Sequence, residues 1–222
     1  MEDKIINGKK CYIYENSAAK ACLIQPVDDH DLELLDKEVE LIKELFPKTP
    51  FTLAALLIES WNTELSPWQA PAVFGTEDFG CGAAETLSFI TDSLLPRLGG
   101  KKHYYLGGYS LSGLFALWSA YQTDIFEGIA AVSPSVWFPG WESYMQNHTI
   151  KTTKVYLSLG DREEKTRNKT MSAVGNCIRR QHDLLLTSDA VKACTLEWNP
   201  GNHFTDTELR TAKGFAWLLN EK

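Results

Sequence analysis

The sequence has no long apolar segment. No stretch approaches the ~18 consecutive apolar residues that a membrane-spanning helix requires. Residues 1–10 also lack the apolar run of a secretory signal peptide. We therefore expect no membrane span and a cytoplasmic location.

Cysteines and histidines are few and irregularly spaced. The five cysteines are odd in number and include no Cys-x-x-Cys pair, which predicts reduced thiols and not a disulfide framework or a zinc site. The five histidines do not stand at ligand spacing either. A metal-dependent hydrolase is therefore the least favoured class of enzyme, and we expect no metal site.

Basic blocks, linkers and repeats are missing as well. The chain has 22 lysines and arginines against 29 acidic residues, a net charge of −7, so nucleic acid is an unfavourable partner. No low-complexity segment divides the 222 residues, and 44% of them are hydrophobic, enough for a substantial core. We expect one domain over residues 1–222.

What the chain does have is a regular alternation of strand and helix patterns. The run 51–58 is almost continuously apolar, which is typical of a central parallel strand buried on both faces. The alternation predicts an α/β fold, with a mostly parallel central sheet and helices on both faces. Strands are predicted at 10–14, 20–25, 51–58, 103–106, 126–132, 155–159 and 195–198, and helices near 31–46, 83–95, 111–121, 178–185 and 209–218.

Residues 103–118 contain the candidate nucleophile. A β-favouring run leads through two glycines to Ser110 and continues as an apolar helix, which would hold the serine hydroxyl at the carboxyl edge of the sheet. The free N–H groups and the positive dipole end of that helix would face an oxyanion forming beside the serine. The simpler interpretation is that Ser110 or Ser112 only caps the helix.

The segment from Gly108 to Gly113 resembles the nucleophile elbow of the α/β-hydrolases, G-x-S-x-G, with Ser112 in place of the last glycine. The elbow needs a small side chain there because strand and helix pass closely. Serine is the next smallest choice after glycine and alanine, so the departure weakens the match without breaking it.

The candidate base and acid follow in the order of the hydrolase template, which is nucleophile, acid, histidine. His203 comes after the last predicted strand, and no other histidine has the required position. As base it would take the proton of Ser110, because a serine hydroxyl is a weak nucleophile until a neighbouring base removes its proton.

The acid is one of three residues that follow the predicted strand 155–159. A carboxylate behind the imidazole fixes the tautomer of the ring and stabilises the imidazolium. We favour Glu163 because it lies three residues past Gly160, which matches the common G-x-x-[DE] spacing of this loop. Asp161 and Glu164 remain alternatives.

With these pieces, the second half of the chain resembles the esterase branch of the α/β-hydrolases, the group that contains enterobactin (siderophore) esterases, S-formylglutathione hydrolases and feruloyl esterases. The matching segments are 108–113, 133–137, 160–163 and 201–203. The resemblance implies an α/β-hydrolase fold with a shortened amino-terminal part and a serine ester hydrolase without a cofactor. It also implies that Ser110 is the nucleophile, that His203 is the base and that the loop after Gly160 supplies the acid.

The resemblance further implies two oxyanion donors. One is the N–H of Leu111, directly after the nucleophile. The His-Gly pair usually found after the third strand is replaced here by Gln25-Pro26-Val27, and Pro26 has no N–H. The second donor would come from Val27, from Asp28 or from the side chain of Gln25.

Aromatic residues in two segments are candidates for substrate contact. The connection 59–81 is long, and a long loop inside a compact domain is more often functional than idle. It contains Trp61 and Trp68, while Trp137 and Trp141 lie in a segment that has no obvious lid insertion. We predict substrate contacts for Trp61, Trp68 and Trp137, with Trp141 as a further candidate and ordinary packing as the alternative.

The sequence therefore predicts a serine carboxylic-ester hydrolase that acts on a small-molecule ester through an acyl-enzyme. A thioesterase or an acyltransferase using the same site is one alternative. A non-catalytic binding protein of the same fold is another, motivated by the altered elbow and the missing His-Gly pair. The identity of the ester and the oligomeric state, a homo-oligomer included, stay open.

Overall fold

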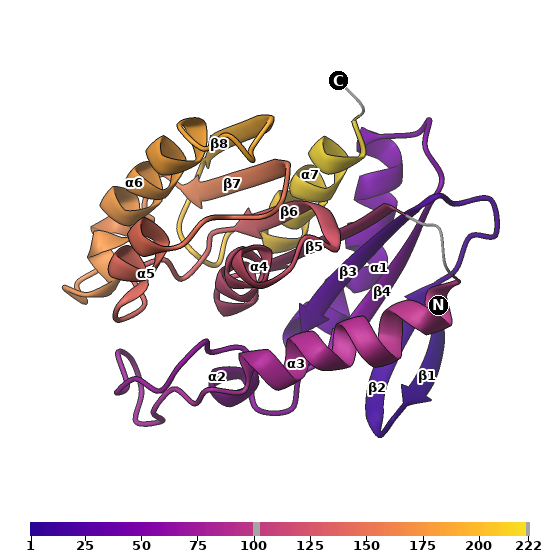
Figure 1. The fold of residues 1–222 in the computed structure, drawn as a ribbon, viewed down its shortest axis with the longest axis horizontal. Coiled ribbons are helices and arrows are strands. Elements are labelled where there is room, and N and C mark those ends of the chain that lie inside the picture. Colours follow the sequence, from indigo (N-terminus) through magenta and orange to yellow (C-terminus); the bar gives the residue numbers. More distant parts are fainter. Residues whose placement is uncertain (100–102, 221–222) are drawn as a thin grey trace.

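The computed structural model describes residues 1–99 and 103–220, and an eight-stranded sheet runs through them (Figure 1). The strand order is β1-β2-β4-β3-β5-β6-β7-β8. The six strands from β4 to β8 in this order are parallel, whereas β2 is antiparallel to both β1 and β4. The strands are β1 (Glu2–Ile6), β2 (Lys9–Tyr14), β3 (Ala21–Val27), β4 (Phe51–Leu57), β5 (His103–Tyr109), β6 (Phe126–Val132), β7 (Lys154–Gly160) and β8 (Ala193–Asn199).

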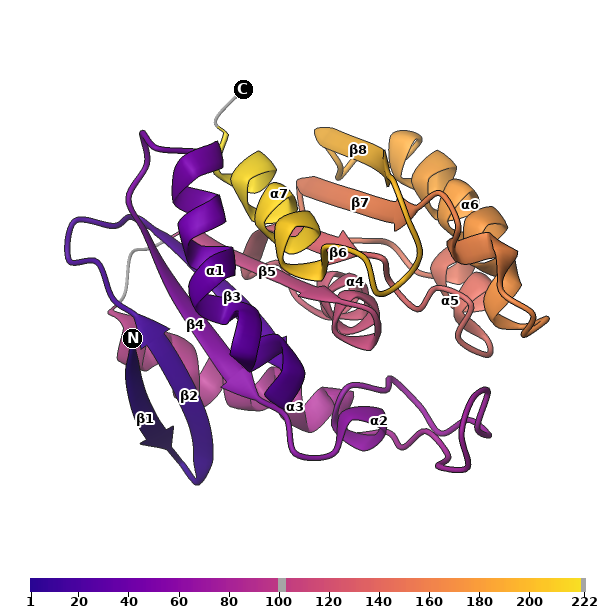
Figure 2. The same cartoon turned by 180° about the vertical axis from the view of Figure 1, so that it is seen from behind.

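Helices cover both faces of this sheet (Figures 1 and 2). One face carries α1 (Asp29–Leu45) and α7 (Thr207–Leu219), which pack against each other. The opposite face carries α3 (Ala83–Phe89), α4 (Leu111–Gln122), α5 (Trp141–Asn147) and α6 (Val174–Leu186), and the short α2 (Trp61–Glu64) lies in the connection after β4. This arrangement confirms the predicted α/β architecture.

The core has two layers because the central strands are buried on both faces. In β6, Ile129 and Ala131 belong to the layer under α3 and α4, while Ala130 and Val132 belong to the layer under α1 and α7. Successive side chains of a strand point to opposite faces, so a strand in this position has to be apolar at every residue. The sheet therefore provides a rigid platform whose carboxyl edge carries the loops after β3, β5, β6, β7 and β8.

The amino-terminal hairpin contains β1, a strand that is not among those predicted from the sequence. β1 pairs with β2 across a turn at Asn7 and Gly8, where φ is +45° and +87°. Asn-Gly is the strongest short-range signal for such a hairpin turn. The Asn7-Gly8 pair that indicates the hairpin is thus present in the sequence. It lies in the amino-terminal part, which the resemblance implies is shortened.

The helix predicted near 83–95 is longer and less regular than expected. α3 is followed by a π-helical turn, Ile90–Leu94, and by a 3-10 turn, Leu95–Leu98, that contains Pro96. Proline is tolerated at the start of a helical turn because its missing N–H has no intrahelical acceptor there. The helical segment therefore continues past Pro96 and ends at Leu98.

Candidate active site

The candidate nucleophile lies between β5 and α4. Ser110 directly follows β5, and its φ of +57° is rare for a residue with a side chain. The turn is tight: a side chain on Gly113 would place its Cβ 2.9 Å from the carbonyl oxygen of Gly108. Such strain of about 1–3 kcal/mol persists only where the surrounding structure enforces it, and it clusters at functional sites.

Ser112 occupies the space where the elbow pattern expects glycine. Its hydroxyl is fully buried and donates a hydrogen bond of 2.8 Å to the carbonyl oxygen of Pro26, at the end of β3. A Cβ on Gly108 would lie 2.0 Å from this hydroxyl, so the glycine leaves room for the serine. The departure from G-x-S-x-G is therefore accommodated and satisfied within the fold.

The structure brings Ser110, His203 and Glu163 into one hydrogen-bonded row. The Oγ of Ser110 lies 3.0 Å from Nε2 of His203, and Nδ1 of the same ring lies 2.7 Å from Oε2 of Glu163. The three residues follow β5, β8 and β7, at the same edge of the sheet. Their order along the chain and their convergence match the sequence prediction.

Three donors besides the imidazole hold the carboxylate of Glu163. Its Oε1 accepts hydrogen bonds from the hydroxyl of Ser133 at 2.7 Å, from the N–H of Gly160 at 2.7 Å and from the guanidinium of Arg210 at 3.2 Å. Burial opposes ionisation of this side chain, but the bonds from His203, Ser133 and Gly160 outweigh it and lower the pKa of Glu163 below its usual value. The carboxylate is thus charged and fixed behind the histidine.

Arg210 is a member of the site that the sequence analysis missed. It lies in α7, only 1% of its surface is exposed, and it donates to the hydroxyl of Tyr109 at 3.1 Å and to the carbonyl of Pro200 at 2.8 Å. Burial first, and then the charge of Glu163, raise the pKa of Tyr109 to about 12, so its hydroxyl stays neutral. No sequence feature separates Arg210 from a solvent-facing arginine on a terminal helix.

Neither alternative acid contacts His203. Asp161 accepts the N–H of Gly201 at 2.9 Å, which ties the loop of the histidine to the loop of the acid. Glu164 is paired with Arg179 at 3.1 Å. Of the three acids named from the sequence, Glu163 is the one whose carboxylate reaches the imidazole.

The candidate oxyanion donors differ in where they point. Leu111 is the first residue of α4, directly after the nucleophile. The carbonyl of Val27 accepts the N–H of Ile58, which follows β4, at 2.9 Å. The N–H and C=O groups of one strand residue point to the same side of the strand. The N–H of Val27 therefore also faces β4 and not Ser110. The side-chain amide of Gln25 donates to Glu38 at 3.3 Å. The geometry therefore disfavours Val27 and Gln25 as donors.

The predicted substrate-contacting tryptophans separate into two groups. Trp61 lines a cavity together with Ser110, and Trp137 lines a second cavity next to His203. Trp68 does not line either cavity: its ring stacks on the fully buried Trp141 at 6.5 Å and its Nε1 donates to Pro139. The structure thus corrects the prediction for Trp68, which packs in an aromatic cluster, and for Trp141.

Two cavities flank the row of hydrogen-bonded side chains. The smaller, of about 170 Å³, is lined by Ser110, by Asp28 and by the first turn of α1, and the larger, of about 300 Å³, by residues of the acid loop and of the segment that leads into α6. His203 and Phe204 line both. Phe204 is 86% exposed, an unusual position for a phenylalanine, and the sequence analysis did not single it out.

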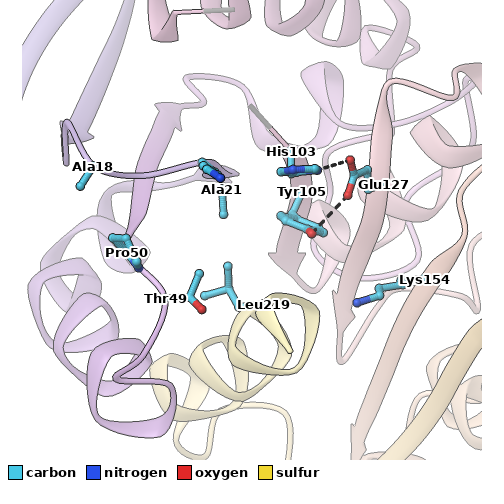
Figure 3. Close-up of a pocket in the computed structure, with 10 residues that line it drawn as sticks. Ala18, Ala21, Thr49, Pro50, His103, Tyr105, Glu127, Lys154 and Leu219 are labelled. Carbon is cyan, nitrogen blue, oxygen red and sulfur yellow. Dashed lines mark hydrogen bonds and ion pairs between the residues drawn. The ribbon is translucent and has the colours of Figure 1, made fainter. Parts of the chain in front are cut away.

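A separate cavity of about 410 Å³ lies at the other edge of the sheet (Figure 3). Its polar groups already bind one another: His103 contacts Glu127, and the hydroxyl of Tyr105 donates to the same carboxylate at 3.4 Å. Lys154 donates to the carbonyl of Asn220 at 2.7 Å. The length of β5 separates this cavity from Ser110, and we place the candidate active site at the carboxyl edge.

Two features are absent from the described residues, a cluster of metal-binding side chains and a membrane-spanning helix. Within residues 1–99 and 103–220, no three or more His, Cys, Asp or Glu side chains gather as a metal ion would require. In the same part of the chain, no helix has both the length and the apolar character needed to cross a membrane.

The mostly parallel sheet with a serine at the strand-to-helix turn after β5 defines an α/β-hydrolase fold. Solved structures with this fold include a siderophore hydrolase, EstA, from Aspergillus nidulans (18% identity, TM-score 0.71, 95% of this chain and 89% of that one). An IroE-like serine hydrolase from Shewanella oneidensis aligns with 15% identity and a TM-score of 0.76 over 95% of this chain and 75% of that one. At these identities the likeness establishes the fold alone.

The sequence itself identifies the family. Residues 60–203, more than half of the chain, match the Esterase family, described as "Putative esterase". The chain belongs to this family of ester-hydrolysing enzymes. No curated protein matches the chain by sequence.

Proposed function

We propose that the protein is a serine carboxylic-ester hydrolase that acts on small-molecule esters through an acyl-enzyme, with Ser110 as nucleophile, His203 as base and Glu163 as acid. The observation that supports this most is the unbroken row of hydrogen bonds from Ser110 Oγ through both ring nitrogens of His203 to Glu163. Membership of an ester-hydrolysing family supports the same reaction.

Each step of the reaction has a group in position. As the Oγ of Ser110 attacks the ester carbonyl, its proton passes to Nε2 of His203, 3.0 Å away. The imidazolium then donates that proton to the departing alcohol, the C–O bond breaks and the acyl group remains on Ser110. Water then attacks the carbonyl of the acyl-enzyme and gives a proton to His203. The imidazolium returns that proton to Ser110 Oγ as the acid is released, which restores the serine. Glu163 stabilises the imidazolium in both halves.

For the oxyanion, we propose the N–H groups of Leu111 and Asp28. The N–H of Leu111 lies at the start of α4, where helical N–H groups lack intrahelical partners. The N–H groups of an extended chain alternate in direction, so that of Asp28, one residue past Val27, is the one expected to face Ser110. Asp28 also lines the smaller cavity together with Ser110.

We further propose hydrolysis over acyl transfer, and a single catalytic domain. The side chain of His203 is 25% exposed, so water reaches the base that must activate it. A single domain is supported by the arrangement of the elements. β1 belongs to the one eight-stranded sheet, and α7 packs on a face of that sheet. The residues of the site come from loops after several of its strands.

The nucleophile can be tested directly. A Ser110→Ala variant should lose several orders of magnitude of kcat/KM towards p-nitrophenyl acetate and should no longer be labelled by a fluorophosphonate probe, because only an activated serine reacts readily. Circular dichroism of both proteins controls for folding. If the variant hydrolyses the ester as fast as the parent, or if the parent resists the probe, the proposed function is wrong.

A further inference from the structure

The two cavities beside His203 differ in size, and each has its own walls. The smaller one, about 170 Å³, is bounded by Trp61, Tyr109 and Thr207. The larger one, about 300 Å³, is bounded by Trp137, Met171 and other residues around α6. An ester has two parts, one on each side of the reacting bond, so two unequal cavities set a direction for the substrate.

The proposed reaction decides which part enters which cavity. The acyl carbon becomes bonded to Ser110, so the acyl part must occupy the cavity that Ser110 lines, which is the smaller one. The alcohol receives its proton from His203 and leaves past the ring, towards the larger cavity that His203 and Phe204 also line. Phe204 stands at the boundary of both and offers an exposed ring to the bound ester.

The charged groups at the two cavities differ: the smaller one is lined by two acidic residues next to His30, and the larger one by two basic residues next to Glu163. Asp28 and Asp31 line the smaller cavity, and burial together with the negative charge of Asp28 raises the pKa of Asp31 to about 7. A raised pKa means that a further negative charge is unfavourable at this place. The smaller cavity therefore disfavours an anionic acyl group.

Arg162 and Lys165 lie at the larger cavity with exposed side chains. The neighbouring carboxylates are already engaged, Glu163 with His203 and Glu164 with Arg179. The two cations are thus available to an anionic group on the ester, at the rim of a cavity whose walls include Trp137 and Val174.

From size and charge together we infer that the substrate class is an ester of a short, uncharged acyl group with a larger, mainly apolar alcohol that carries an anionic group such as a carboxylate. The inference rests on the proposed hydrolysis at Ser110 and goes beyond it by fixing the direction of the ester. Phe204 and Trp137 act as specificity residues for the alcohol part.

Pairs of isomeric esters test the direction without changing composition. Benzyl acetate and methyl phenylacetate contain the same atoms, and their leaving alcohols have nearly equal acidity. After correction for their alkaline hydrolysis rates, kcat/KM should favour benzyl acetate by about tenfold, as one misplaced apolar group in a pocket typically costs. A ratio of one or below would overturn the inference.

The charged versions of the same isomers test the basic rim. A para-carboxylate gives 4-(acetoxymethyl)benzoate and its reversed isomer, the methyl ester of 4-carboxyphenylacetic acid. The preference for the acetate should rise by a further factor of about three, as expected for exposed charges, and should fall back in high salt. An unchanged or smaller preference would contradict the charge assignment.

Two variants locate the effect on the protein. Val174→Trp fills the larger cavity and should lower the benzyl acetate preference, while an Arg162→Gln/Lys165→Gln double variant should remove only the additional preference of the carboxylate pair. If the parent hydrolyses p-nitrophenyl acetate and reacts with the fluorophosphonate probe but shows neither preference, this inference fails while the proposed function stands. If the parent neither hydrolyses p-nitrophenyl acetate nor reacts with the probe, the proposed function itself fails.

Discussion

Two histidine–glutamate pairs lie at opposite ends of β5. At the carboxyl end, His203 binds Glu163, and at the amino end, His103 binds Glu127. The side chain of Glu163 is 4% exposed and that of His203 25%, whereas those of Glu127 and His103 are 47% and 54% exposed. The same two residue types thus form one pair in the interior and one at the surface.

The difference shows that residue type alone does not make a catalytic pair. Glu163 is held by a serine hydroxyl, a backbone N–H and the buried Arg210, and the second nitrogen of its histidine reaches a serine. At the amino end, the carboxylate of Glu127 contacts His103 and the hydroxyl of Tyr105. Electrostatic interactions are several times stronger at low dielectric than in water, so the buried pair can stabilise a charge on its histidine far better.

The largest contrast is expected from removing each histidine. His203→Ala should lower kcat by about four to six orders of magnitude, since the serine loses its base. His103→Ala should leave kcat within about twofold, since its pair is exposed. Steady-state hydrolysis of p-nitrophenyl acetate measures both, and a large loss in the His103 variant would mean that the amino end takes part in the reaction.

Neutralising each glutamate should give the next largest contrast. Glu163→Gln should lower kcat by about three to four orders of magnitude, because an amide can favour the wrong tautomer of His203 and does not stabilise the imidazolium. Glu127→Gln is the matched surface control and should have little effect. Asp161→Asn tests the alternative acid, and a loss as large as that of Glu163→Gln would reassign the role.

The cations beside the two pairs should differ in their effect on stability. Arg210→Met leaves Glu163 buried with fewer donors and should lower the free energy of unfolding by about 3–5 kcal/mol. Lys154→Met, near the other pair, removes a bond to a backbone carbonyl and should change it by less than about 1 kcal/mol. Urea denaturation followed by fluorescence gives both values, and equal effects would show that burial is not the deciding variable.

The smallest contrast concerns acid sensitivity. The folded pKa of Glu163 lies below its unfolded value of about 4.3, so its ionised form stabilises the fold above that pH, and this contribution is lost as the pH falls through the folded pKa. Between pH 5 and pH 3 the parent should therefore lose stability more steeply than Glu163→Gln. Melting temperatures across this range test the slope, and parallel curves for the two proteins would contradict it.

Much of the fold and the main row of the site could be predicted because the signals are local or ordered. The alternation of apolar strands and amphipathic helices requires a mostly parallel sheet, and parallel strands bring their carboxyl ends to one edge. Ser110, Glu163 and His203 each follow a predicted strand, so their proximity follows from topology. Only the spacing after Gly160 favours Glu163 over Asp161, and the contact with His203 agrees with that preference.

What could not be predicted depends on packing across the sheet. Arg210 reaches Glu163 from a helix on one face, and nothing in its sequence neighbourhood indicates that it is buried. Trp61 and Trp68 are seven positions apart in the same connection, yet one lines the cavity of Ser110 and the other stacks on Trp141. The direction of the Val27 N–H depends on the strand order, in which β3 lies between β4 and β5. The local sequence does not determine that order.

The buried hydroxyl of Ser112 has a consequence for how the enzyme works. Its bond to Pro26 joins the start of α4 to the end of β3, the two segments that bear the proposed oxyanion donors. Those donors are then spaced when the chain folds and need no rearrangement as negative charge develops, which is the arrangement that lowers a barrier most effectively. A Ser112→Gly change would remove this bond and leave a small cavity, so it should weaken the spacing of the two donors without touching any reacting atom.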